Sequence, residues 1–328
     1  MRTKVVYVLI SSENDIYLEQ LWVSLFSLKH HNPKVYSVVV ADKDTASRIN
    51  DANHCGLREL IDEVKEVEFA KEISCKERSR FLKTSLRKLL IGDFLFLDTD
   101  TVITDDLSEI DALKEDVAIV LDLHCRFNAH PYEKSIRRKV KKLFVIDLNP
   151  ETDYYNSGVM FVRDTVTAHR FFDEWHKNWQ SAKDNPQGLQ DQQSLVYTIN
   201  KIGIVAPLSG EYNCQVLGSI EFLSRAKIIH FFNTQWSGAP VSVFFEKSFY
   251  RKVRNEGGIS KEIGQQILNC KASFVSPSMP IGLEDMKIWR TASFKLLRVL
   301  SKHKRIFSLG NKASSLILKF INKNSSIH

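Results

Sequence analysis

Residues 94–103 read Phe-Leu-Phe-Leu-Asp-Thr-Asp-Thr-Val-Ile, and the fold prediction starts from this stretch. Its first four residues form an uninterrupted apolar run, which is typical of a short strand buried on both faces of a sheet. Two acidic residues, Asp98 and Asp100, follow the run. In open α/β sheets, ligands bind just beyond the carboxyl ends of the strands. The stretch therefore predicts a strand with a ligand site at its end.

The spacing of the two acids is that of a metal site. Side chains two residues apart point to the same face of an extended chain. Two carboxylates on one face suit Mn²⁺ or Mg²⁺, which fills its remaining positions with water and diphosphate oxygens. Such an ion offsets the charge that develops on a departing diphosphate. We expect Asp98, Thr99 and Asp100 to hold the metal and a diphosphate group.

Two other interpretations of these residues are open. The same letters match the motif of haloacid-dehalogenase-type phosphohydrolases, in which Asp98 would be the nucleophile and Asp100 a general acid and base. That fold normally begins with the motif, whereas two strand–helix units precede it here, and no later Gly-Asp-x-x-x-Asp completes it. The chain could also be a non-catalytic peripheral membrane protein on a degenerate nucleotide fold, since fold does not dictate function.

The residues before this stretch alternate between strand and helix patterns. Apolar β-branched runs at 4–10 and 35–41 predict strands, and the apolar stripe of 16–31 predicts a helix between them. A third strand at 64–69 and a helix at 76–90 then lead to the aspartates. Alternation of this kind predicts a parallel sheet with helices on both faces.

The pattern continues to about Trp236 and then fades. The remaining predicted strands lie at 116–121, 158–162 and 227–232, and the predicted helices at 167–180 and 188–200. Pro277 and Pro280 mark a linker. We expect a catalytic domain at 1–240, an extension at 241–285 that completes it, and a separate tail at 286–328.

Composition favours a cytoplasmic protein with a sizeable core. The chain has 328 residues, 43% of them hydrophobic. It contains no run of about 18 apolar residues, so we expect no membrane-spanning helix. The start of the chain reads as a buried strand and not as an export signal. Its five cysteines are scattered without a Cys-x-x-Cys pair, which is typical of reduced thiols in the cytosol.

Three further motifs follow the aspartates. They are Tyr155-Asn156-Ser157-Gly158-Val159-Met160-Phe161, Leu189-Gln190-Asp191-Gln192-Gln193-Ser194-Leu195 and Ile229-His230-Phe231. Together with Asp98-Thr99-Asp100 they resemble, over about residues 4–235, the GT-A-fold glycosyltransferases of family 8, which include glycogenin and bacterial galactosyltransferases. The resemblance implies an α/β fold of GT-A type, a Rossmann-like mixed sheet that binds nucleotide-diphospho-sugars.

The resemblance also implies roles for individual residues. His230 is expected to join Asp98 and Asp100 on the metal, although an isolated histidine is more often a structural core residue. The other implied positions surround the donor sugar and the acceptor: Asn156 and Ser157 in the sugar pocket, and Asp191 and Gln192 as the catalytic pair.

Residues for the nucleotide are less tightly specified. Arg80 and Lys83 lie three residues apart on the helix before the aspartates, where the family has a basic donor-binding residue. Either could contact the nucleotide or its phosphates, or the two could form a solvated surface pair. Ser11 lies at the end of the first predicted strand, where members of the family contact the nucleotide base. Asp42 lies at the end of the second.

Two segments depart from the family pattern or go beyond it. The family often follows the histidine with Gly-Lys-Pro-Trp, but this chain has no lysine at 232–240, so Trp236 is expected only to cover the site. A basic segment at 126–142 has three open interpretations: a lid on the acceptor side, a surface that contacts the membrane, or a solvated helix.

Basic charge is concentrated at the end of the chain. Residues 286–328 hold ten Lys or Arg and no acid, which leaves 36 basic and 39 acidic residues elsewhere. Basic amphipathic helices of this type lie on anionic membranes. The alternative is a helix packed on the catalytic body. Nucleic acid is not an expected partner, because the sequence has no recognisable nucleic-acid-binding motif beside the basic charge.

These patterns predict a metal-dependent enzyme that moves a hexose from a nucleotide-diphosphate sugar, a UDP-sugar by expectation, to a saccharide or glycolipid acceptor. The resemblance implies retention of the anomeric configuration and a place in bacterial surface polysaccharide synthesis. The tail predicts a peripheral location at the inner face of the cell membrane.

Overall fold

The computed structural model describes residues 1–51, 54–185, 187–216, 221–232, 242–274, 291–300 and 303–325. The chain divides into two compact units, Met1–Phe274 and Val275–His328. Trp236 and the linker prolines Pro277 and Pro280 lie outside the described residues.

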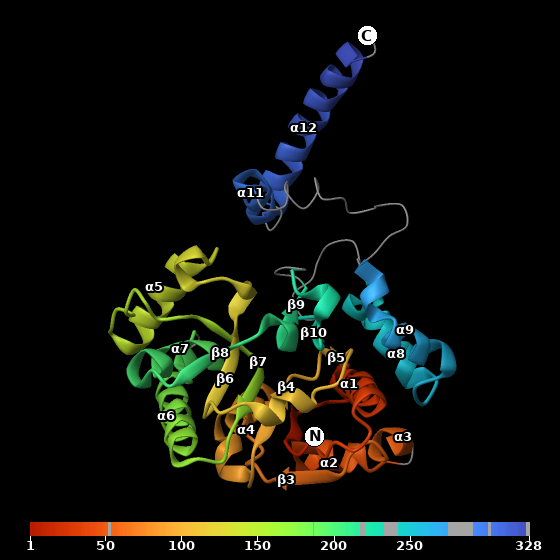
Figure 1. Cartoon of the computed structure of the whole chain (residues 1–328), viewed down its shortest axis with the longest axis vertical. Helices are drawn as coiled ribbons and strands as arrows, with labels where there is room; N and C mark the ends of the chain where they lie inside the picture. Colours follow the sequence, from red (N-terminus) through yellow and green to blue (C-terminus); the bar gives the residue numbers. More distant parts are fainter. Residues whose placement is uncertain are drawn as a thin grey trace. The chain divides into compact units, whose positions relative to one another are not determined.

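The centre of the first unit is a seven-stranded mixed sheet (Figure 1). In spatial order its strands are β3 (Glu63–Val67), β2 (Ser37–Asp42), β1 (Lys4–Leu9), β4 (Phe94–Leu97), β7 (Tyr155–Val162), β6 (Val117–Leu121) and β8 (Val205–Leu208). The first four strands pair in parallel, as do β6 and β8, but β7 is antiparallel to both of its neighbours. The predicted mixed α/β fold is confirmed.

Strand alternation sends side chains into two cores. On β1, Val5, Tyr7 and Leu9 enter one apolar cluster, whereas Val6 and, directly after the strand, Ile10 enter another. Helix α1 (Tyr17–His31) contributes to the first, together with α8 (Lys247–Asn255) and α9 (Lys261–Leu268). The second lies under α4 (Cys75–Leu89), α6 (Val166–Ala182) and α7 (Asp191–Ile202). Helices therefore cover both faces, as expected for parallel strands.

A second, three-stranded sheet adjoins the first. It consists of β5 (Thr101–Ile103), β10 (Ile228–His230) and β9 (Cys214–Gln215). β10 is antiparallel to β5 and parallel to β9. The sequence analysis missed β5, β8 and β9, because strands of two to four residues are too short to show a period.

The first unit also contains the helices α2 (Lys43–Ile49), α3 (Cys55–Arg58) and α5 (Glu133–Phe144). Helix α5 contains residues 133–142 of the predicted basic segment, whereas residues 126–132 precede the helix. It buries Ile136 and Val140 in a third apolar cluster and exposes Lys134, Arg138 and Lys142. This part of the segment is therefore an amphipathic helix packed on the first unit.

The described residues of the second unit, 291–300 and 303–325, form the helices α11 (Ala292–Leu300) and α12 (Lys304–Ser325). Large apolar side chains on both are exposed, among them Leu296, Leu309 and Leu316. Within the described part of the chain, no helix combines the length and the hydropathy needed to cross a membrane.

Candidate active site

The loop Asp98–Asp100 joins the two sheets, since β4 ends at Leu97 and β5 begins at Thr101. The Asp98 N–H donates to the Gly158 carbonyl at 2.7 Å, which ties the loop to β7. The Thr101 hydroxyl donates to the Asp98 carbonyl at 2.8 Å. These bonds hold both acids at the carboxyl end of β4, where the sequence placed them.

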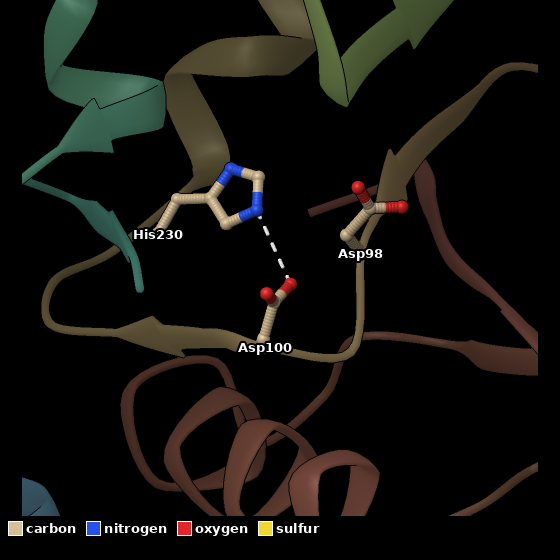
Figure 2. A group of neighbouring side chains, drawn as sticks. All are labelled: Asp98, Asp100 and His230. Carbon is tan, nitrogen blue, oxygen red and sulfur yellow. Dashed lines mark ion pairs between the residues drawn. The ribbon is translucent and has the colours of Figure 1, made fainter. Parts of the chain in front are cut away.

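His230 reaches the same place from the end of β10 (Figure 2). Ligand atoms of Asp98, Asp100 and His230 all lie within 4.8 Å of one another. His230 Nε2 is 3.2 Å from Asp100 Oδ1. An octahedral ion with bonds of about 2.1 Å separates its ligands by about 3 to 4 Å. The three residues therefore fit a divalent cation with only a small contraction.

The environment of His230 fixes the direction of its ring. The side chain is 2% exposed, Nδ1 lies 3.1 Å from Asn213 Oδ1, and the ring stacks on Phe232. A β-carbon at Gly158 would lie 2.2 Å from the His230 Cε1 atom, so only glycine leaves room for the ring. Burial alone would lower the pKa of His230, but Asp100 outweighs it and the pKa is raised.

A second charged cluster adjoins the first. Lys83 Nζ lies 3.2 Å from Asp98 Oδ1 and 3.5 Å from Asp191 Oδ2. Arg80 Nε is 2.9 Å from Asp191 Oδ1, but its angle is poor for a hydrogen bond, so the contact is ionic. Burial raises the pKa of Asp191, whereas Lys83 and then Arg80 lower it to a net value of about 2. Arg80 and Lys83 are thus paired cations inside the site.

Ser157 and Gln192 belong to this second cluster. The Ser157 hydroxyl lies 3.0 Å from Asp191 Oδ2 and 3.1 Å from Gln192 Oε1. The Gln192 amide donates to the Tyr155 carbonyl. The structure therefore brings Arg80, Lys83, Ser157, Asp191 and Gln192 together beside Asp98.

Asn156 points to the other side of β7 and is 8% exposed. Its Nδ2 donates to Asp122 Oδ1 at 2.8 Å, and its Oδ1 accepts from the Gly158 N–H and from Asn213 Nδ2, each at 3.0 Å. The amide expected in the sugar pocket is engaged here with protein groups behind His230.

Ser11 and Asp42 have partners of their own at the ends of β1 and β2. Ser11 Oγ donates to Asp15 and accepts from Arg48. Asp42 Oδ1 caps α2, and Oδ2 pairs with Arg78 at 2.9 Å. Both residues are buried, whereas Thr99 is partly exposed in the loop Asp98–Asp100.

Sequence reasoning missed three residues at this site. Tyr17, at the start of α1, is 36% exposed. Partial burial raises the pKa of Tyr17, and the charges of Asp15 and Asp100 raise it further, whereas the charge of Arg80 lowers it. Asn213 and Asp122 form the hydrogen-bonded support of Asn156. Their neighbours in sequence carry no recognisable motif.

Comparisons with known proteins identify the fold and the family. The profile of the family described as Glycosyl transferase family 8 matches residues 8–236. A search of curated proteins finds no match. The chain is similar to the apo structure of the bifunctional glycosyltransferase WbbM, with 17% identity and a TM-score of 0.52 over 82% of this chain. It covers 51% of the WbbM chain, about half of its length.

An active-site mutant of LgtC is also similar in fold. The identity is 14% and the TM-score 0.50, with 79% of this chain and 98% of that chain covered. At such identities the similarity shows the fold alone. The profile match spans more than two thirds of the chain and contains the aspartates, Asn156–Gly158, Asp191 and His230. It sets aside the phosphohydrolase alternative for Asp98, and the chain belongs to glycosyltransferase family 8, whose members are sugar-transferring enzymes.

Proposed function

We propose that this enzyme moves a hexose from a nucleotide-diphosphate sugar, a UDP-sugar by preference, to a saccharide or lipid-linked acceptor with the help of Mn²⁺ or Mg²⁺. The observation that supports the proposal best is the convergence of Asp98, Asp100 and His230. Oxygen and imidazole ligands of this kind suit a divalent ion that also binds diphosphate. When bound, such an ion would stabilise the charge on the leaving diphosphate.

The charges of the site suit metal and diphosphate together. With His230 neutral, three carboxylates (Asp98, Asp100 and Asp191) face two cations, Arg80 and Lys83, which leaves one net negative charge. A divalent ion reverses the sign, and a diphosphate with two negative charges restores it. Donor and metal are therefore expected to bind cooperatively, because the cation removes the repulsion that the diphosphate meets and the diphosphate strengthens the attraction that the cation meets.

Lys83 and Arg80 are proposed to hold the donor. Lys83 is 4% exposed and contacts the carboxylates of both Asp98 and Asp191, and its charge lowers the pKa of Asp191. Near the diphosphate, the two cations would stabilise the negative charge left after the sugar departs. Ser11 and Asp42, at the ends of β1 and β2, are proposed to lie near the nucleotide.

Asp191 and Gln192 are proposed to orient the sugar and the acceptor. Asp191 begins α7, and both of its oxygens have partners: Arg80 for Oδ1, Lys83 and Ser157 for Oδ2. A carboxylate held in this way is suited to accept hydroxyl hydrogens and poorly suited to attack carbon. Retention of configuration is accordingly proposed without a covalent sugar on Asp191.

The tail supports the proposed location, the inner face of the cell membrane. Its described helices expose Leu296, Leu309 and Leu316, and residues 286–328 hold ten Lys or Arg and no acid. Apolar side chains flanked by cations bind anionic lipid surfaces. An acceptor in surface polysaccharide synthesis would be met there.

Activity on a panel of UDP-sugars, with Mn²⁺ or Mg²⁺ and with EDTA, tests the function. We expect sugar release or transfer only with a divalent ion. Asp98→Asn and Asp100→Asn should each lower kcat/KM by about 100-fold or more, as expected when transition-state charge stabilisation is lost. Asp116→Asn serves as the control, because Asp116 directly precedes β6 and accepts a hydrogen bond from Thr165. Full activity in EDTA, or in Asp98→Asn, would contradict the metal role.

A further inference from the structure

We propose that Asn213 is a positioning residue that sets the tautomer of His230, so that Nε2 presents its lone pair to the metal position. The inference rests on the proposed metal-dependent function. Asn213 ends the short 3₁₀ turn Gly210–Asn213 before β9 and is 0% exposed. Its amide contacts the buried nitrogen of His230, the side opposite Asp100.

The orientation of the Asn213 amide follows from its neighbours. The Gly158 N–H can only donate, so the Asn156 atom 3.0 Å from it must be Oδ1. The other end of that amide, Nδ2, donates to the Asp122 carboxylate at 2.8 Å. Asn156 Oδ1 can only accept, so the Asn213 atom that lies 3.0 Å from it must be the donor Nδ2.

Asn213 consequently presents its oxygen to His230. An amide oxygen only accepts, so the Nδ1 atom of His230, 3.1 Å away, must carry the hydrogen. In a neutral ring the lone pair is then on Nε2, which faces Asp100 and the metal position. Metal-ligating histidines commonly depend on such a partner behind the ring.

The chain of hydrogen bonds is anchored at its far end. Asp122 Oδ2 accepts from His130 Nε2 at 2.9 Å, and His130 Nδ1 in turn accepts from the Tyr132 N–H at 3.1 Å. His130 is buried just before α5. Each hydrogen bond in this series, from Tyr132 to His230, therefore has one assigned donor and one assigned acceptor.

Two substitutions separate positioning from structural support. Asn213→Leu has a similar volume but cannot accept from His230. Asn213→Asp still accepts, but its carboxylate meets Asn156 Oδ1 without a hydrogen between them. Asp is therefore expected to destabilise the fold more than Leu, whereas Leu should weaken the metal site more than Asp.

A matched control lies in α6. Asn178 is 7% exposed, and its amide donates to Thr198 Oγ1 at 2.9 Å. Asn178→Leu removes a buried amide of the same kind without touching the metal cluster. It should lower stability and leave metal affinity unchanged.

The measurement is Mn²⁺ binding to the full chain without nucleotide, followed by the electron paramagnetic resonance of free Mn²⁺. We expect Asn213→Leu to weaken binding about 10- to 100-fold and Asn213→Asp to remain within about threefold of the parent. Unfolding in urea should give the opposite order for the two variants. Nitrogen NMR of metal-free protein at about pH 9 should show the Nδ1–H tautomer of His230 in the parent and its loss in Asn213→Leu.

Two results would overturn the inference. One is parent-like Mn²⁺ affinity in Asn213→Leu, and the other is a metal affinity that follows unfolding free energy across all three variants. If the parent itself binds no Mn²⁺, the proposed metal function fails, and the NMR comparison still tests the tautomer.

Discussion

At the scale of single residues, Gly158 contributes by the absence of a side chain. A methyl group there would lie 2.2 Å from His230 Cε1 and 2.7 Å from Nδ1. The ring cannot yield toward Asn213 without breaking its hydrogen bond, and Phe232 stacks on it. The glycine at position 158 of β7 therefore leaves the space that the His230 ring occupies.

Gly158→Ala should displace His230 and weaken Mn²⁺ binding at least about 10-fold, because one ligand leaves its position. The measurement is Mn²⁺ titration with thermal unfolding on the same samples. Gly203→Ala is a control, since Gly203 closes α7 at a φ of +72° with open space around it. It should cost about 1 kcal/mol of stability through backbone strain alone and keep metal affinity. Unchanged affinity in Gly158→Ala would contradict the steric argument.

His176 makes stability depend on pH. Burial, with a smaller effect of Lys88, lowers its pKa to about 4. The unfolded chain binds the proton from about pH 6.5 downward, whereas the folded chain does so only near pH 4. The contribution of His176 to stability is therefore complete above pH 6.5 and is lost as the pH falls towards 4.

Urea unfolding at pH 7 and pH 5 checks this dependence. The parent should lose about 1.5 kcal/mol more than His176→Phe between the two values, with an allowance for solvent screening. His169→Phe is the comparison, because His169 is exposed and pairs with Asp164 at the surface. An equal loss in the parent and in His176→Phe would rule out the buried histidine as the cause.

At the scale of elements, α8 braces the loop that follows β1. Arg254 donates to both oxygens of Glu19, which is 1% exposed, and to the carbonyls of Glu13 and Asp15. This single side chain therefore joins the end of the first unit to the loop proposed to meet the nucleotide. The sequence placed this helix only in an extension that completes the domain.

Arg254→Met should lower stability by about 3 kcal/mol, because it leaves the buried Glu19 carboxylate without its partner. The KM for the donor should rise more than kcat falls, since the loop loses its brace. Adding Glu19→Gln should recover part of the stability. Lys252→Met, on the same helix but with exposed partners, should cost less than about 0.5 kcal/mol. Equal effects of the two single changes would refute the brace.

At the scale of the whole molecule, we propose that catalysis belongs to the first unit and lipid binding to the second. The core clusters, the two sheets and the candidate site lie within Met1–Phe274. We expect a chain ended at Phe274 to fold, to bind Mn²⁺ and to use soluble acceptors as the full chain does.

The same truncation should abolish sedimentation with vesicles rich in anionic phospholipid. Lys295→Gln with Lys312→Gln in the full chain should weaken vesicle binding about 10- to 30-fold, because each cation near the surface contributes about 1 kcal/mol. Lys134→Gln with Arg138→Gln on α5 provides the comparison within the first unit. Vesicle binding that survives the truncation would assign the lipid contact to the first unit.

The sequence of this protein was sufficient to predict the fold class and the residues at the strand ends. Buried parallel strands are long apolar runs, and a ligand loop at a carboxyl end follows the run directly, as Asp98 follows Leu97. The motifs also placed His230 beside the aspartates 130 residues earlier in the chain. Periodicity and local chemistry carry this information, because each is encoded within a few neighbouring residues.

Tertiary structure was needed for what supports these residues. The antiparallel direction of β7, the link from Arg254 to Glu19 and the pairing of Lys83 with both Asp98 and Asp191 depend on contacts between distant segments. Asn213 stands in a sequence without any motif, and its importance follows only from the direction of hydrogen bonds around it. Short strands and single buried amides leave no periodic trace, since their partners are chosen by packing and not by the residues next to them in the chain.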